Sequence, residues 1–314
     1  MSKKIHLLYD GDFLRYAVGF ANEEFQALYG GKPVFKSGSM VECNEYCTAN
    51  GLDHDRVEIK KVAAPVAHCL ASVKRALGAA VKQTNASAIT IYISGSTNFR
   101  TKIAKQKEYK GNRKELVKPL LYNDITQYLL KRFNAIKTEG IEADDAMAIK
   151  ATEIISSDEW EPIICTADKD LYQVPVKVFN VQSGVLTDVS QDPFGELTLK
   201  AQGSGSVLKG YGIKFFYSQC LTGDVVDNIP GLSRCGAKNA YKMLAECPDE
   251  ESCQKVVLEA YKKVYGDDPV ERTAWDGSKY IGNYLTLLEE NCRLLWMLRE
   301  RPNKDGTHRF MQWW

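Results

Sequence analysis

The sequence has few histidines and no suitably spaced cysteine pairs, which are the residues that triad hydrolases and zinc sites use. It contains four histidines in 314 residues, and none stands in a serine or cysteine nucleophile motif, so triad chemistry has little support. The nine cysteines are odd in number and widely spaced, which is typical of reduced thiols, and Cys43 and Cys47 have no second pair at a zinc spacing. No apolar run is long enough to cross a bilayer and no secretory segment begins the chain, so we expect a cytoplasmic protein without membrane contact.

An excess of charge of one sign is also lacking. The 41 basic and 40 acidic residues leave a net charge of +1, so the composition alone does not indicate a nucleic-acid partner, and the distribution of charge must decide. The Gly/Ser-rich sequence at 203–205 follows no predicted strand and opens no predicted helix, which excludes a dinucleotide fingerprint. The length allows two domains, or one large domain with a substantial core.

Short apolar runs alternate with helical patterns along residues 5–181. Strands are predicted at 5–9, 88–93, 163–166 and 176–181, and helices at 63–81, 126–133 and 145–155. Strands that alternate with helices indicate a parallel sheet covered on both faces. Ligands of such sheets collect at the carboxyl ends of the strands.

Acidic residues gather where these strands and loops end. They form four clusters: Asp10 and Asp12; Glu142, Asp144 and Asp145; Asp168 and Asp170; Asp224 and Asp227. Alternate residues of an extended segment point the same way, so both members of a pair can face one pocket. A turn or a helix dipole explains any single cluster. Together, crowded carboxylates raise one another's pKa or bind hard cations, and they indicate a metal-dependent enzyme that acts on phosphates.

The most basic stretch lies between the second strand and the Glu142 cluster. Residues 100–118 carry eight basic and two acidic side chains, a net charge of +6. Their apolar residues form no continuous helical stripe, so the segment is either a solvated surface helix or an arch that grips a polyanion. We favour the arch.

The character of the chain changes after a Gly/Ser-rich stretch at 202–212. Helical patterns at 215–221 and from about residue 237 flank a loop that contains Gly231 and Gly236. Small residues before a helix N-terminus suit phosphate binding through backbone amides, and Arg234 and Lys238 favour it, although an ordinary helical hairpin has the same glycines. An amphipathic helix at 284–298 is expected to pack on this region.

These motifs resemble, in order, the motif series of the 5′ nuclease family. That family includes flap endonucleases, phage 5′-to-3′ exonucleases and the 5′-nuclease domain of bacterial DNA polymerase I. The resemblance covers residues from about 5 to 245, and spacing and size are closest to free-standing phage exonucleases. The motifs are Tyr9-Asp10-Gly11-Asp12, Phe99-Arg100, Tyr109-Lys110-Gly111-Asn112-Arg113, Gly140-Ile141-Glu142-Ala143-Asp144-Asp145, Thr166-Ala167-Asp168-Lys169-Asp170 and the segment 223–231.

The resemblance implies an α/β, PIN-like fold. Its central twisted sheet is mainly parallel and flanked by helices, with a helical arch and a C-terminal helix-hairpin (helix-3-turn-helix) region. We expect a nuclease domain at 1–201, with the basic arch at about 98–120, and a duplex-DNA-binding helix-hairpin domain at 202–314.

The resemblance also implies roles for individual residues. One Mg²⁺ is expected at Asp10, Glu142 and Asp144 with Asp145 close by, and a second at Asp168, Asp170, Asp224 and Asp227. Asp12 is not a core motif position and is expected as an outer-shell acid. The catalytic residues would be Lys110, Arg113, Asp168 and Asp170, with the two cations on the scissile phosphate. The DNA contacts would be Arg100, Lys105, Tyr109, which would stack on a terminal base, Lys110, Arg113, Gly231, Arg234, Gly236 and Lys238.

The implied activity is that of a Mg²⁺-dependent 5′-to-3′ exodeoxyribonuclease or structure-specific flap endonuclease. It would cleave phosphodiester bonds near 5′ ends in phage-type replication, primer removal or DNA degradation, as a monomer in the host cytoplasm if phage-encoded. Its partner would be DNA with a 5′ end, nick, gap or flap, or an RNA/DNA hybrid; Mn²⁺ would substitute for Mg²⁺, and K⁺ would bind at the helix-hairpin. Two alternatives stay open: a PIN-like ribonuclease, and a non-catalytic structure-specific DNA-binding protein.

The chain departs from the family pattern at two positions. The family has an aspartate five to seven residues before the Phe-Arg pair, where this chain reads Ser94-Gly95-Ser96-Thr97-Asn98. We expect activity to survive, with weaker metal binding that an aspartate at Gly95 would strengthen, or with Asp12 helping through water. The second departure is Arg234, which stands where the hairpin of the family has its middle glycine.

Overall fold

The computed structural model describes residues 3–113, 116–203 and 205–303. Lys114 of the basic stretch lies outside this range. The described part is built around a six-stranded sheet with strand order β6-β5-β1-β7-β8-β9. All neighbours in it are parallel except β8 and β9. The strands are β1 (Lys4–Asp10), β5 (Ala88–Ile93), β6 (Ile136–Lys137), β7 (Trp160–Thr166), β8 (Lys177–Asn180) and β9 (Leu186–Asp188).

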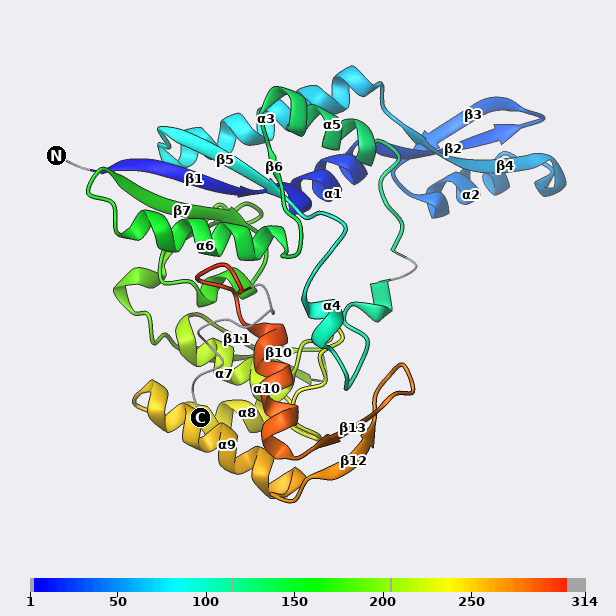
Figure 1. Cartoon of the computed structure of the whole chain (residues 1–314). Coiled ribbons are helices and arrows are strands. Elements are labelled where there is room, and N and C mark those ends of the chain that lie inside the picture. Colours follow the sequence, from blue (N-terminus) through cyan, green and yellow to red (C-terminus); the bar gives the residue numbers. More distant parts are fainter. Residues whose placement is uncertain (1–2, 114–115, 204, 304–314) are drawn as a thin grey trace.

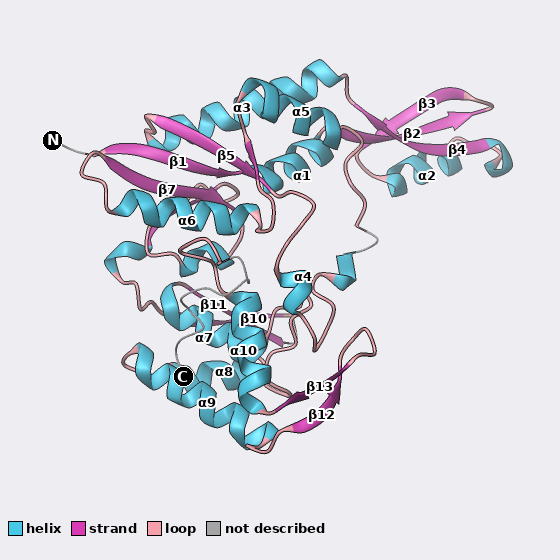
Figure 2. Ribbon diagram, in the orientation of Figure 1, coloured by secondary structure: helices cyan, strands magenta, loops and turns pink. Residues whose placement is uncertain are grey.

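Helices cover both faces of this sheet, as Figures 1 and 2 show. Consecutive residues of β1 point to opposite faces: Leu7 packs into the core formed with α1 (Gly11–Ala21), α3 (Val66–Thr84) and α5 (Tyr122–Arg132). Leu8 packs into the core on the other face, which is formed with α6 (Ala143–Ile155). The predicted α/β class with a mainly parallel central sheet is therefore confirmed.

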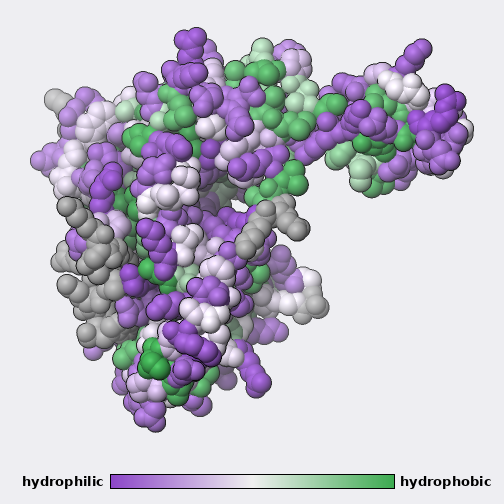
Figure 3. Space-filling view, turned by 45° about the vertical axis from the view of Figure 1, so that its right-hand side comes forward, coloured by the Kyte–Doolittle hydropathy of each residue, from purple (hydrophilic) through white to green (hydrophobic). Residues whose placement is uncertain are grey.

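A small antiparallel sheet follows α1 and projects away from the central sheet (Figure 1). It consists of β2 (Glu23–Tyr29), β3 (Lys32–Ser37) and β4 (Val57–Ala63), with α2 (Met40–Ala49) and the 3-10 turn η1 (His54–Arg56) between the last two strands. Ala27, Cys43 and Cys47 form the centre of its own small core. Figure 3 shows this projection standing clear of the rest of the molecule.

The basic segment at 98–120 is not a continuous helix in its described part. It contains one helical turn, α4 (Arg100–Ile103), and the 3-10 turn η2 (Gly111–Arg113). The rest of its described part is loop that runs between the central sheet and the C-terminal region (Figure 1). Because the segment has no apolar stripe, no packed face holds it in a longer helix.

The C-terminal region is mainly helical. It contains the predicted pair α7 (Gly212–Thr222) and α8 (Ala237–Leu244), with α9 (Glu250–Tyr265) and α10 (Tyr284–Leu295) packed against them. Two hairpins flank these helices, β10 (Leu197–Gln202) with β11 (Gly205–Gly210) and β12 (Val270–Thr273) with β13 (Lys279–Gly282). Two 3-10 turns, η3 (Asp170–Gln173) and η4 (Val189–Gln191), precede them.

Buried side chains join the two halves of the chain. Met297 and Leu298, which follow α10, pack into the same core as α6. None of the helices in the described ranges is both long and apolar enough to cross a membrane.

Candidate metal and nucleic-acid site

The carboxyl ends of two neighbouring strands carry the first acids of the site. Asp10 ends β1 and caps α1, where its carboxylate accepts hydrogen bonds from the Phe13 amide (2.9 Å) and the Thr166 hydroxyl (2.8 Å). Thr166 ends β7, and Asp168 follows it and accepts a bond from the Asp170 amide (2.8 Å). Because β1 and β7 are adjacent and parallel, these acids meet at one edge of the sheet, as the sequence predicts.

Glu142 and Asp227 meet although they are far apart along the chain. The Tyr109 hydroxyl lies 2.8 Å from Glu142 Oε2 and 3.0 Å from Asp227 Oδ2. The Lys110 ammonium pairs with Glu142 and lies 3.7 Å from Asp227 Oδ2. Arg113 pairs with the other oxygen of Asp227. Residues 109–113, the foot of the basic segment, therefore hold the second and fourth acidic clusters together.

Asp170 and Asp224 share a different cation. Lys169 pairs with Asp224 and lies 3.8 Å from Asp170. The Gln219 amide of α7 donates to Asp170 at 2.6 Å. The third and fourth clusters are thus joined to each other and to the C-terminal helices.

Burial and mutual repulsion disfavour ionisation of the central carboxylates. Burial and the nearby charge of Asp12 raise the pKa of Asp10 to about 7. Burial and Asp168 raise the pKa of Asp170 to about 8. Burial raises the pKa of Asp168, and burial followed by the charge of Asp10 raises that of Asp144 well above its ordinary value. The site therefore has more negative charge than its own cations neutralise.

Glu142 behaves in the opposite way. Burial would raise its pKa, but the charges of Lys110 and Arg100 outweigh burial and lower it. Burial would likewise lower the pKa of Lys110, and Glu142 and Asp227 raise it instead. Lys110 also has a left-handed backbone with φ of 56°, a conformation that costs energy outside glycine and often marks functional positions.

The donor set fits hard divalent cations, although it is not a closed metal cage. Its ligating groups are all carboxylate oxygens, which Mg²⁺ and Mn²⁺ prefer. Asp144 forms no hydrogen bond or ion pair with another residue of the described ranges, yet the charges of Asp10, Asp168 and Glu142 all act on it. Among the described residues, no three His, Cys, Asp or Glu side chains are already arranged to coordinate a single ion. Lys110 neutralises Glu142, and Lys169 neutralises Asp224. The negative charge of the central carboxylates with raised pKa values remains in excess; these are Asp10, Asp144, Asp168 and Asp170.

Two predicted site residues, Arg100 and Asp145, form a buried ion pair instead. Both are 0% exposed, and the Arg100 guanidinium binds both oxygens of Asp145, one at 2.8 Å. Arg100 also donates to the carbonyls of Leu294 (2.8 Å) and Trp296 (2.7 Å). The prediction that Arg100 contacts DNA is therefore wrong, and Asp145, which was predicted close to the first metal ion, is bound by Arg100 instead. The pair joins α4, α6 and the end of α10.

Two further predicted DNA contacts are buried. Tyr109 is 6% exposed and its ring packs in the core of the C-terminal region, so it cannot stack on a terminal base. Gly231 is buried against Gly223, where an added Cβ would lie 2.2 Å from the Gly223 amide nitrogen. Their roles are structural: Tyr109 links Glu142 to Asp227, and Gly231 closes the loop that carries Asp224 and Asp227.

The remaining predicted contacts of the helix-hairpin lie on the surface. Arg234, Gly236 and Lys238 are exposed around the start of α8, and no side chain caps that helix. Arg234 adopts φ of 60°, the left-handed conformation that the expected glycine would favour. The loop thus keeps this backbone conformation and gains a cation. Lys105 is exposed, with its ammonium 5.3 Å from the centre of the Tyr280 ring.

The missing carboxylate at Gly95 cannot be restored by substitution. A Cβ at this position would lie 1.9 Å from the Thr138 carbonyl oxygen and 2.6 Å from Glu139 Oε1, so an aspartate would displace the backbone. Asp12 approaches the same strand end, where its carboxylate accepts from the Ser94 amide at 3.0 Å and pairs with Arg15. The expectation that aspartate at Gly95 would strengthen metal binding is therefore wrong.

The sequence patterns did not identify Lys169, Gln219 or Gln173. Lys169 lies between Asp168 and Asp170 in one motif, and this position between two predicted metal ligands could have identified it. The two glutamines are each 2% exposed and carry no motif. The Gln173 amide donates to Gln219 (2.9 Å) and to the Leu295 carbonyl (3.1 Å), which extends the hydrogen-bonded chain from Asp170 to the end of α10.

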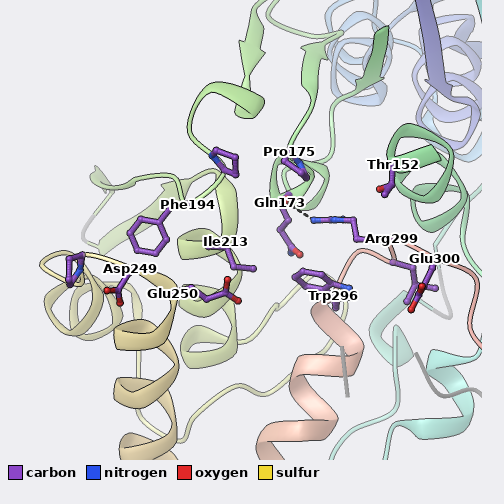
Figure 4. Close-up of a pocket in the computed structure, with 13 residues that line it drawn as sticks. Thr152, Gln173, Pro175, Phe194, Ile213, Asp249, Glu250, Trp296, Arg299 and Glu300 are labelled. Atoms are coloured by element: carbon purple, nitrogen blue, oxygen red, sulfur yellow. Dashed lines mark hydrogen bonds between the residues drawn. The ribbon is translucent and has the colours of Figure 1, made fainter. Parts of the chain in front are cut away.

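A cavity of about 670 Å³ lies beyond Gln173. Figure 4 shows Gln173, Arg299 and Trp296 close together at its wall, with Phe194 on the other side. The lining is mainly apolar and includes none of the nine clustered acids. The cavity is therefore separate from the carboxylate site.

Comparison with known proteins finds similarity to 5′-3′ exonucleases and to DNA polymerase I. Residues 59–196 match the family model of the 5′-3′ exonuclease, N-terminal resolvase-like domain. A 5′-3′ exonuclease of Buchnera aphidicola (subsp. Schizaphis graminum) is 30% identical over 164 residues, which are 50% of this chain and 51% of that protein. DNA polymerase I of Rhizobium leguminosarum is 30% identical over 147 residues, 45% of this chain and 13% of the polymerase.

Solved structures from bacteriophage T5 have a similar arrangement at low identity. The T5 5′-exonuclease with bound zinc ions is 17% identical, with a TM-score of 0.48 over 93% of this chain and 89% of that one. The T5 flap endonuclease in a complex with DNA and metal ions is 15% identical, with a TM-score of 0.49 over 83% of this chain and 89% of that one.

The chain resembles 5′-3′ exonucleases over residues 59–196, which contain β5, the basic segment and the second and third acidic clusters. It spans about half the length of the curated exonuclease that it matches and 13% of the polymerase.

Proposed function

We propose that this protein is a divalent-metal-dependent 5′-to-3′ exonuclease and flap endonuclease of DNA. The observation that carries the proposal is the meeting of Asp10, Glu142, Asp168 and Asp227 beside Lys110 and Arg113. Excess carboxylate next to two cations is the arrangement that binds metal ions together with a phosphate. The proposed cofactor is two Mg²⁺ ions, with Mn²⁺ as a substitute and K⁺ at the helix-hairpin.

The residues of the chain would share the work as follows. Asp10, Glu142 and Asp144 hold one cation, and Asp168, Asp170, Asp224 and Asp227 hold the other. When bound, such ions supply a nucleophilic water and neutralise charge on both sides of an in-line displacement. Lys110 and Arg113 have side chains that are 26% and 36% exposed, so they can also reach a phosphate and stabilise its developing negative charge.

The rest of the molecule would bind and orient the substrate. Arg234, Gly236 and Lys238 at the start of α8 would hold the duplex backbone, since an uncapped helix N-terminus and two cations attract phosphate without reading sequence. The region from residue 202 would then be the duplex-binding domain and residues 1–201 the nuclease domain. We propose that the protein acts as a monomer in the cytoplasm.

The direct test is incubation with Mg²⁺ and a 5′-labelled substrate series. Duplex, flap and RNA/DNA hybrid substrates should release short 5′ products, and Asp168→Asn or Asp170→Asn should abolish release while DNA binding remains and weakens with salt. Wild-type turnover in both variants would exclude these residues from the mechanism. Cleavage of RNA alone would favour a ribonuclease, and binding without cleavage would favour a non-catalytic protein.

A further inference from the structure

Two exposed valines lie between acids of the carboxylate site. Val225 is 85% exposed and Val226 is 58% exposed. Both lie between Asp224 and Asp227, in the loop that joins α7 to α8. Other adjacent apolar pairs of the chain, such as Leu116 and Val117, are exposed as well. Val225 and Val226 differ from them because they lie between two acids of the carboxylate site, where a bound partner would cover them.

The loop displays the valines in a fixed conformation. Asp224 and Ile229 exchange backbone hydrogen bonds of 2.9 and 2.7 Å. The Asp224 carboxylate accepts from the amides of Val226 (2.7 Å) and Asp227 (3.2 Å). Their exposure is therefore not the result of an unsupported loop, because the backbone on both sides is bonded.

The same loop is bonded to the foot of the basic segment. The Asn112 side chain donates to the Val225 carbonyl (2.8 Å), and Arg113 donates to the Val226 carbonyl (3.0 Å). The Lys110 amide donates to the Asp227 carbonyl (2.9 Å). The backbone of both valines therefore lies beside the two cations that are proposed to hold the scissile phosphate.

We propose that Val225 and Val226 form a platform for the nucleobases next to the scissile phosphate, at the 5′ end of the substrate. This inference rests on the proposed function. A nucleotide chain offers one apolar surface, the faces of its bases, and apolar side chains that contact them displace water and unstack the terminal pair. β-branched side chains suit this role because they lose little rotamer freedom on contact.

The platform would act in substrate binding rather than in chemistry. Neither valine carries a group that transfers a proton or holds a charge, so the rate of the bound complex should not depend on them. Their contribution should appear in KM and in the dissociation constant for DNA.

The test uses a double variant, Val225→Thr/Val226→Thr, which keeps the shape and branching of both side chains and removes their apolar character. With a 5′-labelled duplex we expect KM to rise about tenfold, equal to about 1.4 kcal/mol, with kcat unchanged. DNA binding measured in chelator, without cleavage, should weaken by the same factor. Val185→Thr is the matched control, because that valine is 55% exposed and lies next to β9, outside the site.

A second substrate separates base contact from any general effect. A duplex whose 5′-terminal nucleotides are abasic should bind the wild type about tenfold more weakly than the intact duplex does. The double variant should bind the abasic duplex as weakly as the wild type does, with no additional loss. The platform would be overturned if the double variant lost affinity equally for both substrates relative to the wild type, or if its KM with the intact duplex were unchanged. In either case, cleavage by the wild type would leave the proposed function standing. Absence of cleavage by the wild type on every substrate would instead overturn the proposed function.

Discussion

Replacement of Asp170 by asparagine should stabilise the metal-free protein. Burial and Asp168 raise the pKa of Asp170 from 3.8 to about 8. Since the pKa in the folded state lies above the unfolded value, the folded protein binds the additional proton between these values, and its free energy of unfolding falls as the pH rises from about 4 to about 8. Asparagine has the shape of the protonated acid, and it can still accept the hydrogen bond that Gln219 donates at 2.6 Å.

The magnitude follows from the same shift. If the group titrated alone, the shift would correspond to about 5 kcal/mol at pH 7.5. Asp168 and Asp224 share the repulsion and Lys169 loses a neighbour 3.8 Å away, so we expect a net gain of about 2 kcal/mol, or about 4 °C in Tm for a chain of this size.

Thermal and urea unfolding in chelator at pH 4 and pH 7.5 would measure this gain. The gain should be present at pH 7.5 and nearly absent at pH 4, and added Mg²⁺ should stabilise the wild type more than the variant. Asp158→Asn, which removes an exposed acid outside the site, is the control. A variant that is less stable than the wild type at pH 7.5 without metal would refute the reasoning.

Four further substitutions test three separate parts of the structure. Arg100→Met should lower the free energy of unfolding by about 3–5 kcal/mol, because it leaves the Asp145 carboxylate buried without its cation; exposed Lys102→Met is the control, and equal stability of the two variants in urea would contradict the structural role. Lys110→Ala and Arg113→Ala should each lower kcat about 10²- to 10³-fold on a 5′-labelled flap while DNA binding changes little, and an unchanged kcat would remove them from the chemistry. Arg234→Gly should leave stability within about 1 kcal/mol, since it relieves a φ of 60° but adds chain entropy. The same variant should reduce by about 1 the slope of log affinity for duplex against log salt, and an identical slope would show that Arg234 does not contact phosphate.

Strand ends were predictable from the sequence because they follow from local pattern. A short apolar run that ends in alternate acids fixes where Asp10 and Asp168 lie, and parallel pairing of β1 and β7 then brings them together. The positions of Glu142, Asp144 and Asp145 were predictable as well, because acidic residues favour a helix N-terminus whether or not they bind a metal ion.

Roles that depend on long-range partners were not predictable. Arg100 lies in the most basic stretch of the chain, and its charge pattern looked like that of a DNA contact. Only the fold reveals that Asp145 and two carbonyls after residue 293 surround it. Tyr109 was misassigned for the same reason, since aromatic residues stack on bases and also fill cores.

For the segment at 21–61, which contains most of the projecting sheet, the sequence indicated only an insertion after the first helix. Its strands carry mixed polar and apolar residues, and its core consists of a few side chains around Cys43 and Cys47. So small a core leaves little periodic signal, and the fold shows only that this segment is a distinct outgrowth after α1.

The central claim is that remote acidic clusters build one site for two divalent ions. Anomalous scattering from a crystal soaked in Mn²⁺ would test it most directly. We predict two peaks, one among Asp10, Glu142 and Asp144 and the other among Asp168, Asp170, Asp224 and Asp227. Manganese bound only elsewhere on the protein, or no peak at these carboxylates at saturating concentration, would contradict the account.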